Sequence, residues 1–388
     1  MVNIPVEPPI TEFLHQKATL QRLPLNGSFE LTPLCNMNCR MCYVRISKEE
    51  QEAIRPLHTA EEWLALGKAA RDSGMLYLLL TGGEPFSRPD FREILAGLHR
   101  MGLLITVNSN GTLIDEKTVE WLKETPPVRI NITLYGASDE TYGRLCRNPK
   151  GFTQVCRALE LLRKAGISVR LNCSVTPHNG QDLEEMMAFA KREGLLIQAT
   201  SYMFPPLRRA PDQIGRNDRF SPEEAAYYSA KIESLLNGED DYLERMKTRN
   251  LDGLCGEVGE DCSDTVGDGI RCRAGKCSFW VTWEGKLMPC GMMPGTGAKN
   301  VFESGFQEAW KAAVQESDAI RLPAKCSKCG LRQLCKACAA MVYTESGNYH
   351  QVPEYRCAMA HAYPDACRQV EREILERRAC ITQGQEKA

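Results

Sequence analysis

The stretch CNMNCRMCY, residues 35–43, places three cysteines on one short loop that follows the apolar segment SFELTPL. A structural zinc site needs four ligands and a disulfide needs two, but the next cysteine along the chain is Cys146. The short spacings allow three thiolates to converge on one centre, and a 4Fe–4S cluster held by three cysteines keeps one iron open for a small chelating ligand. The alternative is a zinc site completed by a distant residue, such as His58 or Cys146.

The composition, apart from the cysteines, is that of an ordinary globular protein. The chain has 388 residues, of which 43% are hydrophobic and 25% are charged, so it has room for two or three domains. The formal net charge of −2 argues against a general nucleic-acid or membrane-surface binder. The N-terminus lacks the pattern of a signal peptide, and the longest apolar run, at 75–80, is too short to cross a bilayer. We therefore expect a cytoplasmic protein that binds neither nucleic acid nor membrane.

Eighteen cysteines are more than such a chain would hold as disulfides in a reducing compartment. Three lie at 35–42 and eleven lie between 255 and 367, at spacings typical of metal ligands. Three single cysteines lie between these groups, and one lies near the C-terminus. The distribution favours metal binding over disulfide formation.

Between about residues 28 and 237, short apolar runs alternate with amphipathic segments. Thr59 with Glu62 and Ser221 with Glu224 have the spacing of capping boxes, which mark helix starts. Six β/α units follow one another, with strands expected in the stretches 28–34, 75–83, 103–111, 129–136, 167–176 and 195–203. Such repeats predict an α/β fold with a parallel sheet, either doubly wound or a barrel. The polar loops fall at the carboxyl ends of the strands, where these folds place their active sites.

The chain beyond residue 237 has little periodicity. It contains a hairpin-like segment at 278–290, a helix near 303–316 and a terminal helix at 366–378. It has too few core-forming runs to fold by packing alone, so we expect metal clusters to stabilise it. The expected organisation is a lead-in over 1–27, a barrel domain over 28–237, a bridging region over 238–271 and a small cysteine-rich, cluster-stabilised domain over 272–388.

Two polar loops follow neighbouring predicted strands. In TGGEP, residues 81–85, Gly82 and Gly83 allow close backbone approach, and Glu84 can accept a hydrogen bond from an ammonium group. The alternative is a simple strand-to-helix turn with a proline at the start of the helix. In NSNG, residues 108–111, side-chain amides and a hydroxyl lie at the next strand end, although Asn–Gly is also a common turn.

Together these residues resemble the radical S-adenosylmethionine (SAM) superfamily. Its signature is three cysteines separated by three and then two residues, usually with an aromatic residue at the end, followed by a GGE-type motif. Here the matching residues are Cys35, Cys39, Cys42, Tyr43, Gly82, Gly83 and Glu84. The resemblance implies a partial (β/α)6 TIM-like barrel that binds a 4Fe–4S cluster and SAM. In that family an electron from the reduced cluster cleaves SAM to methionine and a 5′-deoxyadenosyl radical, which abstracts hydrogen from the substrate.

The same resemblance assigns SAM contacts to residues at the strand ends. They are Tyr43 for the adenine, Gly82, Gly83 and Glu84 for the amino group, Ser109, Asn110 and Thr133 for the ribose or methionyl part, and Arg144 or Arg147 for the carboxylate. The family often has an aspartate where this chain has Tyr135, so the chain departs from the pattern there.

The later cysteines resemble the SPASM extension of radical SAM enzymes, which holds two auxiliary 4Fe–4S clusters. The resemblance implies one cluster on Cys272, Cys277, Cys290 and Cys338, and another on Cys326, Cys329, Cys335 and Cys357. The family usually has three residues before the last cysteine of the central run, and this chain has two. Alternatives are a pair of zinc sites, or replacement of one auxiliary ligand by Cys255 or Cys262.

SPASM-bearing radical SAM enzymes mostly modify ribosomally made peptides or proteins, by crosslinking or oxidation. Others act on small molecules, through alcohol oxidation or steps in haem synthesis. The resemblance therefore implies a peptide or protein substrate first, a small-molecule substrate second, and a reducing partner such as flavodoxin or ferredoxin. Two classes without this chemistry remain as alternatives, a non-catalytic iron–sulfur electron carrier and a zinc-stabilised interaction protein.

A few further residues are candidates for substrate contact. An arginine-rich segment after the last barrel strand offers carboxylate clamps or is a solvated connector, with Arg208, Arg209, Arg216 and Arg219. For the acidic loop at 255–268 there are two interpretations. It faces the substrate, or it is only an exposed connection between cluster ligands. Cys173, at a strand end, is a candidate hydrogen-atom donor or an ordinary buried thiol.

Overall fold

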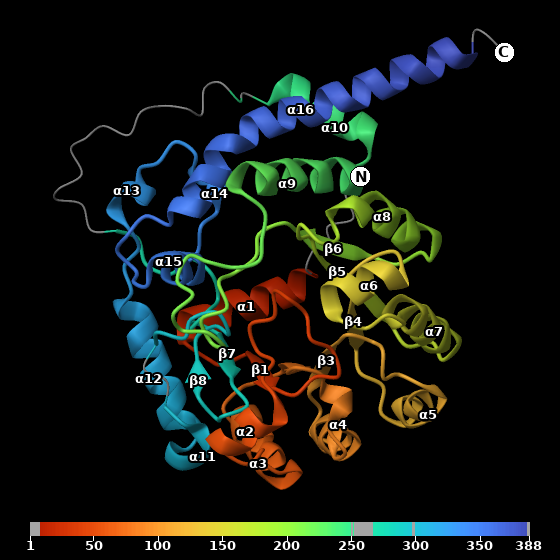
Figure 1. Ribbon diagram of the computed structural model, residues 1–388. Helices are drawn as coiled ribbons and strands as arrows, with labels where there is room; N and C mark the ends of the chain where they lie inside the picture. The colour runs from red at the N-terminus through yellow and green to blue at the C-terminus, as the bar shows by residue number, and fades with distance from the viewer. Residues whose placement is uncertain (1–7, 250, 252–266, 297–298, 386–388) are drawn as a thin grey trace.

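Six short parallel strands form the centre of the computed structural model, which describes residues 8–249, 251, 267–296 and 299–385 (Figure 1). The strands are β1 (Asn26–Glu30), β2 (Tyr77–Thr81), β3 (Leu104–Ser109), β4 (Arg129–Thr133), β5 (Val169–Ser174) and β6 (Ile197–Thr200). Each strand pairs in parallel with the next one along the chain. This consecutive order is that of a barrel, because the strand order of a doubly wound sheet reverses at a switch point. The predicted α/β fold with six β/α units is confirmed.

Two further strands extend the sheet beyond β1. They are β7 (Ser278–Val281) and β8 (Leu287–Met288). β7 pairs in parallel with β1, and β8 runs antiparallel to β7. Among the described strands the order is β6-β5-β4-β3-β2-β1-β7-β8, so β1 meets β7 instead of β6 and the barrel stays open. The cysteine-rich part of the chain is therefore joined by main-chain hydrogen bonds to the strand that leads into Cys35.

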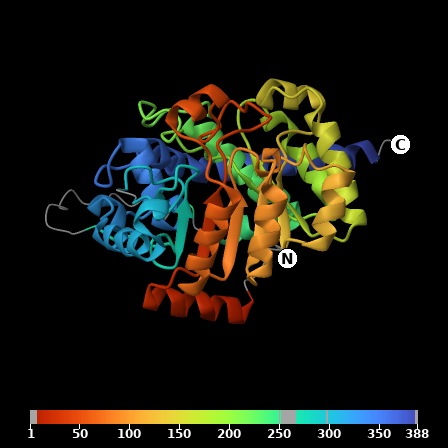
Figure 2. The same cartoon turned by 90° about the horizontal axis from the view of Figure 1, so that it is seen from below.

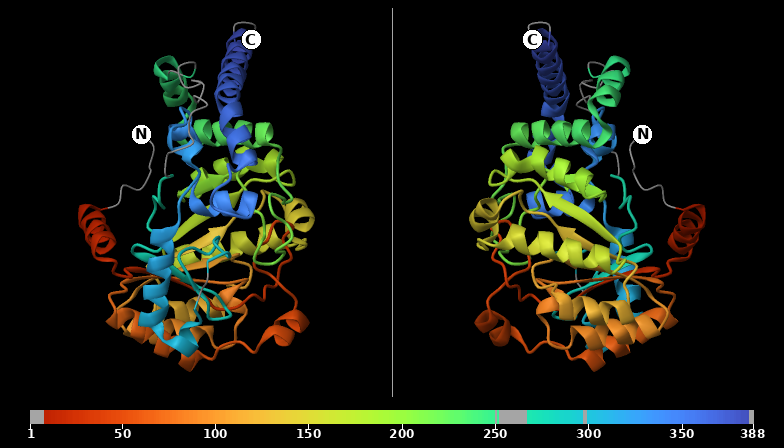
Figure 3. Two further views of the ribbon diagram at one scale, coloured as in Figure 1. Left: turned by 90° about the vertical axis from the view of Figure 1, so that its left-hand side faces the viewer. Right: turned by 90° about the vertical axis from the view of Figure 1, so that its right-hand side faces the viewer.

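Helices cover the outer side of this arc of strands (Figure 3). In the barrel part they are α3 (Ala60–Asp72), η1 (Pro85–Ser87), α4 (Phe91–Arg100), α5 (Glu116–Glu124), α6 (Asp139–Cys146), α7 (Gly151–Lys164), η2 (Gly180–Asp182), α8 (Leu183–Arg192) and α9 (Pro222–Asn237). α1 (Pro9–Gln21) lies across one end of the strands, and α2 (Lys48–Ile54) follows the cysteine loop (Figure 2). Both predicted capping boxes form, with Thr59 at the start of α3 and Ser221 at the start of α9.

The core of the barrel lies between the strands and the helices. Phe29, Leu80, Val107 and Ile130, from four successive strands, are completely buried. Trp63 of α3 is also completely buried, and its ring centroid lies 5.3 Å from that of Phe29. Complete burial of each such side chain contributes about 1.5–3 kcal/mol. This packing fixes the strand ends on which the candidate site stands.

The C-terminal part is mainly helical. Its helices are α10 (Glu239–Thr248), α11 (Val301–Ser304), α12 (Phe306–Ala319), α13 (Ala324–Ser327), α14 (Arg332–Cys335), α15 (Ala339–Ser346) and α16 (Glu354–Gln385). The terminal helix is longer than the sequence predicted and packs along α9, where Tyr227 donates to Glu373 at 2.9 Å (Figure 1). No helix in the described ranges combines the length and the apolar character that a membrane crossing requires.

Two buried ion pairs fasten the segment that follows β6. Arg208 donates to Glu30 at the end of β1, and the exposed fractions of these side chains are 9% and 0%. Arg219 donates at 2.6 Å to Glu345 of α15, with exposed fractions of 5% and 2%. Both arginines therefore bind carboxylates of the protein itself, in place of the substrate carboxylates that the sequence suggested. They connect the mouth of the barrel to β1 and to the cysteine-rich part.

Replacing Arg219 by methionine is expected to destabilise the fold by about 3–5 kcal/mol, because Glu345 would stay buried without its cation. Arg157→Met is the matched control, since the side chains of Arg157 and Glu116 are 63% and 57% exposed and this pair should contribute little. Thermal unfolding of both anaerobically purified variants at one scan rate measures the difference. Equal midpoints for the two variants would contradict this role of Arg219.

Candidate active site

A cavity of about 360 Å³ lies at the carboxyl ends of the strands. The three cysteines of the loop line it, as do six of the residues expected to contact SAM, namely Tyr43, Gly82, Gly83, Ser109, Asn110 and Thr133. The rest of its wall is largely methionine and aromatic, with Met37, Met41, Tyr135, Tyr202, Met203, Phe204, Met292 and Met341. Residues from both halves of the chain therefore enclose one space beside the cysteine loop.

The cysteine loop rests on the end of α6. The backbone amide of Asn38 donates to the carbonyl of Cys146 at 3.0 Å, and that of Arg40 donates to the carbonyl of Leu145 at 3.2 Å. These two bonds satisfy carbonyls that the end of a helix leaves without partners. The loop is thereby held against a rigid element, which a preorganised ligand set requires.

Backbone amides favour negative charge on two of the sulfurs. The Met37 amide donates to Cys35 Sγ at 3.4 Å, and the Arg45 amide donates to Cys42 Sγ at 3.3 Å. Burial nevertheless raises the pKa of Cys35 to about 12, and it also raises the pKa of Cys42. Both thiols are protonated at neutral pH unless a cation binds, so thiolate formation here is coupled to metal binding.

Cys39 has a different environment. Hydrogen bonds with Cys146 and Tyr135 lower the pKa of the Cys39 thiol, despite its burial. Cys146, one candidate for completing a zinc site, is completely buried beside it. The other candidate, His58, stacks on Phe302 with ring centroids 3.6 Å apart and does not line the cavity.

The spacing of the thiols bears on the kind of metal centre. In the part of the chain that the structure describes, no three Cys, His, Asp or Glu side chains are close enough together to bind one metal ion. The sulfurs around a single zinc lie only about 4 Å apart, since each Zn–S bond is about 2.3 Å long. A 4Fe–4S cube attaches each cysteine to a different iron and spaces them more widely. These thiols form no single-ion site among the described residues, and three thiolates on one loop are the donor type that a 4Fe–4S cluster uses.

The two glycines of TGGEP lie directly against the chain that leads into the cysteine loop. The Gly83 amide donates to the Thr32 carbonyl at 2.6 Å, and the Glu84 amide donates to the Leu34 carbonyl at 2.9 Å. A Cβ atom on Gly83 would lie 2.3 Å from the Leu34 carbonyl oxygen, and one on Gly82 would lie 2.5 Å from the Thr32 carbonyl oxygen. Only glycine allows this approach, which positions Cys35 next to the end of β2.

Glu84 is completely buried and connects two strand ends. Its carboxylate accepts hydrogen bonds from the Ser109 hydroxyl at 2.9 Å, the Asn110 amide at 2.7 Å and the Phe86 amide at 3.1 Å. The Asn110 side chain in turn donates to Cys35 Sγ at 3.6 Å. Burial raises the pKa of Glu84 to about 7, although the three hydrogen bonds act in the opposite direction. A cation close to this carboxylate would offset the cost of its ionisation.

Replacing Glu84 by glutamine is expected to stabilise the SAM-free protein, relative to wild type, as pH rises. The pKa of Glu84 in the folded protein, about 7, lies above the usual 4.5. The neutral carboxyl therefore contributes fully to the stability of the wild-type fold below pH 4.5, and wild type loses this stability as pH rises through 7. The loss is about 3 kcal/mol, because one pKa unit corresponds to about 1.4 kcal/mol. Unfolding midpoints at pH 5 and pH 8 measure it, and a pH-independent difference would contradict the prediction. Saturating SAM should reduce the effect if Glu84 accepts from the SAM ammonium group.

Four of the expected residues do not line the cavity. Glu84 is completely buried and bonds to Ser109 and Asn110, which do line it. The Arg144 guanidinium donates to the His178 carbonyl at 2.9 Å, and Arg147 ends α6 in the left-handed conformation with φ 59°. Cys173 is buried in the core, with its Sγ 3.8 Å from Met186 Sδ. Neither arginine lines the cavity, and the surroundings of Cys173 are those of an ordinary buried thiol.

Sequence reasoning missed part of the cavity wall. Met41 and Arg45 line it from within and just after the cysteine loop, and their closeness to the cysteines was a usable signal. Tyr202 comes from the segment after β6, while Met292 and Met341 come from the cysteine-rich part. No local pattern links these three to the barrel, because only the tertiary fold brings them there.

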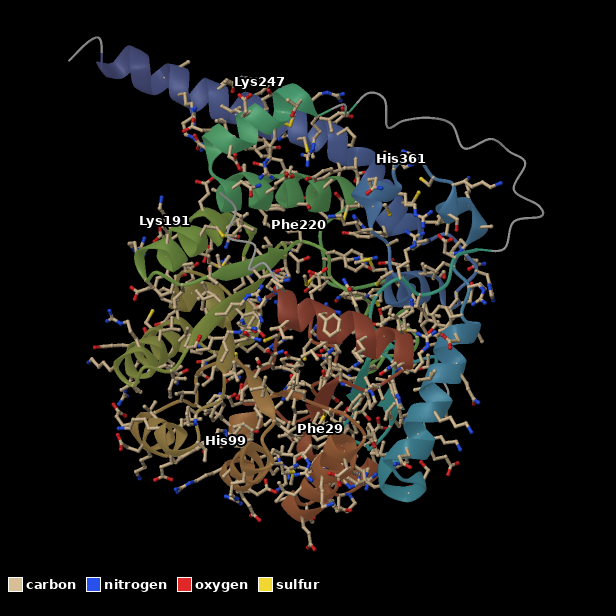
Figure 4. All side chains as sticks on the ribbon, turned by 180° about the vertical axis from the view of Figure 1, so that it is seen from behind. Phe29, His99, Lys191, Phe220, Lys247 and His361 are labelled. Atoms are coloured by element: carbon tan, nitrogen blue, oxygen red, sulfur yellow. The ribbon has the colours of Figure 1, made fainter. Side chains whose placement is uncertain are left out.

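Four of the later cysteines surround one small cavity of about 50 Å³, as the sequence grouped them: Cys326, Cys329, Cys335 and Cys357. Burial raises the pKa of Cys326 to about 11, and the other three cysteines raise it further. Arg271, Arg332 and Lys336 line the same cavity, but Arg271 and Arg332 both pair with Asp268, so Lys336 is the cation of this wall without an ion pair among the described residues. His361 of α16 also lines it (Figure 4).

The other group of four is only partly together. Cys272 and Cys290 line a second cavity, and the pKa of Cys338 is raised by burial and by the nearby Cys272. Cys277 does not line this cavity and is completely buried against Ala18, although its sulfur accepts at 3.3 Å from the hydroxyl of Thr19, which does line it. The alternative ligands at positions 255 and 262, and the acidic loop around them up to residue 266, lie outside the described residues.

Comparison with known proteins finds similarities in the barrel and beyond it. Residues 29–190 match the Radical SAM superfamily. The AdoMet-dependent heme synthase of Methanosarcina barkeri is 26% identical over 348 residues, which cover 84% of this chain and 95% of that protein. The antilisterial bacteriocin subtilosin biosynthesis protein AlbA of Bacillus subtilis is 26% identical over 338 residues, covering 85% of this chain and 70% of AlbA.

A solved structure has the same fold. Native anSMEcpe with bound AdoMet and the Kp18Cys peptide matches with a TM-score of 0.63 and 17% sequence identity. The match covers 91% of this chain and 99% of that chain, so it extends through the cysteine-rich part.

Proposed function

Because residues 29–190 match the Radical SAM superfamily, we propose that this chain is a radical SAM enzyme, which cleaves SAM reductively and abstracts hydrogen from a side chain of a ribosomally made peptide or protein, forming a crosslink or an oxidised residue. When bound, a 4Fe–4S cluster and SAM supply the electron and the 5′-deoxyadenosyl radical. The observation that carries the proposal is the single cavity that gathers Cys35, Cys39, Cys42 and the GGE glycines. Binding of this cluster by Cys35, Cys39 and Cys42 is part of the same proposal.

Different residues around the cavity bind different parts of SAM. The Gly82–Gly83 backbone holds the SAM ammonium, and the buried Glu84 carboxylate positions Ser109 and Asn110 of the cavity wall. Tyr43 and Met41 flank the adenine. Thr133 contacts the methionyl or ribose part from the end of β4. The methionine and aromatic side chains of the remaining wall exclude water, which protects a radical from side reactions.

A neighbouring cavity offers room for the flanking residues of a peptide. It has a volume of about 530 Å³ and shares Tyr43 and Val44 of its wall with the first cavity. Its wall mixes apolar groups such as Ile46 and Leu207 with the charged Arg209 and Glu284. An extended chain lying there would present one side chain to the inner cavity and leave its flanking residues outside. AlbA acts in bacteriocin biosynthesis, and the anSMEcpe structure holds a peptide.

A second candidate is modification of a haem precursor, because heme synthases are among the relatives that match over most of this chain. Tetrapyrroles of that pathway carry several carboxylates. Among the described residues that line the inner cavity, the only cation is Arg45. A wall with one cation suits a peptide side chain better than a polyanionic macrocycle.

The remaining cofactors and partners complete the proposal. We assign two auxiliary 4Fe–4S clusters to the C-terminal cysteines, with the group around Cys326 better gathered than the group around Cys272. Electrons come from a reducing partner such as flavodoxin or ferredoxin.

Anaerobic reconstitution tests the proposed function. The protein should bind about twelve irons, as three 4Fe–4S clusters require, and should release 5′-deoxyadenosine from SAM and dithionite. Short peptides encoded beside the gene should then change mass in the complete reaction and not when SAM is omitted. Protein that carries zinc after reconstitution and releases no 5′-deoxyadenosine would contradict the proposal. A mass change in a tetrapyrrole, with none in any peptide, would favour the second candidate.

A further inference from the structure

Arg45 lies three residues after Cys42 and is one of the residues that line the inner cavity. Its backbone amide donates to Cys42 Sγ, so the position of this residue is fixed relative to the cysteine loop. The other described lining residues are neutral side chains, glycines or the three cysteines. Arg45 is therefore the one fixed positive charge in the wall of the cavity.

This charge has no counter-ion among the residues that the structure describes. The Nε atom of Arg45 is buried and has no hydrogen-bond partner. Neighbouring arginines differ, since Arg40 faces Asp218 at 4.0 Å and Arg208 pairs with Glu30. A half-buried guanidinium without an acceptor loses hydration without compensation. A negatively charged ligand in the cavity would supply that compensation and would therefore bind more tightly.

We propose that Arg45 binds the carboxylate of the ligand in this cavity, and this inference rests on the function proposed above. Guanidinium groups bind carboxylates through two parallel hydrogen bonds, and the free Nε edge of Arg45 provides one of the donors. SAM carries such a carboxylate, and a peptide substrate can carry one as well. Arg144, one residue expected to do this from the sequence, already donates to the His178 carbonyl and lies outside the cavity.

The competing explanation is that Arg45 only compensates the charge of the cysteine loop. Its positive charge contributes to the lowered pKa of Cys39, so it lies near that sulfur. This explanation predicts that loss of the guanidinium changes the iron content or the reduction potential of the first cluster. It predicts no change in discrimination between ligands with and without a carboxylate.

The test compares SAM with decarboxylated SAM, which has the same sulfonium, adenosine and amine but no carboxylate. Dissociation constants are measured by calorimetry on the anaerobically reconstituted protein, and no turnover is needed. Wild-type protein should prefer SAM. Arg45→Met should weaken SAM binding roughly 10- to 150-fold, as loss of a charged hydrogen-bonded partner implies, and should leave decarboxylated SAM nearly unaffected.

Two controls separate this effect from general damage to the loop. Arg40→Met removes an arginine of the same loop that does not line the cavity, and Arg144→Met removes the residue suggested by the sequence. Both should keep the wild-type preference for SAM. Iron content and the spectrum of the reduced cluster show whether each variant has kept its cluster.

A second arm identifies the source of the carboxylate. SAM-loaded wild type and Arg45→Met are titrated with N-acetyl-L-phenylalanine and with its amide, because the methionine and aromatic wall suits that side chain. A lost preference for the acid in the variant, with SAM discrimination intact, assigns Arg45 to a substrate carboxylate. Unchanged discrimination in both arms overturns the proposal, whatever happens to the cluster. If wild type releases 5′-deoxyadenosine in that case, the function proposed above stands; if wild type neither binds nor cleaves SAM, both fail.

Discussion

Replacing Cys35, Cys39 and Cys42 together by alanine is expected to abolish SAM cleavage and to leave about eight of twelve irons. The three thiols line the inner cavity, whereas Cys326, Cys329, Cys335 and Cys357 surround a separate one. Loss of the first set therefore removes one cluster and leaves the ligands of the others in place. Iron analysis after anaerobic reconstitution, together with 5′-deoxyadenosine measured by chromatography, gives the result.

Two single variants make this test specific. Cys156→Ala removes a half-buried thiol of α7 that lines neither cavity, and it should keep both the iron and the activity. Cys146→Ala removes the thiol beside Cys39, and its iron should also stay near twelve if Cys146 is not a ligand. Retained SAM cleavage in the triple variant would contradict the assignment of the first cluster. Loss of all iron would contradict the independence of the three sites.

Replacing Gly83 by alanine is expected to lower SAM cleavage by about 100-fold or more, because misplacement of catalytic groups by about 1 Å has effects of that size. The new Cβ would lie 2.3 Å from the Leu34 carbonyl oxygen and 2.8 Å from that of Pro33. Both are backbone atoms directly before Cys35, so relief of the clash must move the cysteine loop away from β2. We expect weaker SAM binding and partial loss of the first cluster.

The control for this change is Gly143→Ala, because a Cβ at that position would meet the nearest atom, of Pro149, at an ordinary 3.6 Å. It lies in α6, where alanine is also the better helix former. Calorimetric SAM binding and iron content should match wild type in this control and fall in Gly83→Ala. Wild-type values in Gly83→Ala would show that the close approach of the two chains is not needed.

Much of the barrel could be predicted because its signals are local. Alternating apolar and amphipathic segments gave the six strands, and the capping residues Thr59 and Ser221 marked two helix starts correctly. The short spacing of Cys35, Cys39 and Cys42 places them on one loop in any fold. Residues that follow successive parallel strands meet at one edge, which is why Ser109 and Thr133 line the same cavity as that loop.

The rest depends on contacts between distant parts of the chain. Nothing near β7 in the sequence indicates that it pairs with β1, because strand pairing over such a separation has no local pattern. Arg208 and Arg219 read equally well as substrate clamps until Glu30 and Glu345 are seen beside them.

The directions of individual side chains could not be predicted from the sequence either. Strand residues alternate between the two faces of a sheet, so Cys277 shares a face with the buried Phe279, where it packs with Ala18. Cysteine spacing alone does not show this. The unpaired charge of Arg45 also emerges only when its neighbours are known.

The pairing of β1 with β7 has a consequence for how the protein is made. During synthesis, β1 leaves the ribosome about 250 residues before β7 does, which corresponds to roughly 10–50 s at about 5–20 residues per second. Throughout that interval one edge of the strand that leads into Cys35 has no partner, and open strand edges are prone to wrong pairing. We therefore expect fragments that end before β7 to aggregate more readily than the full chain.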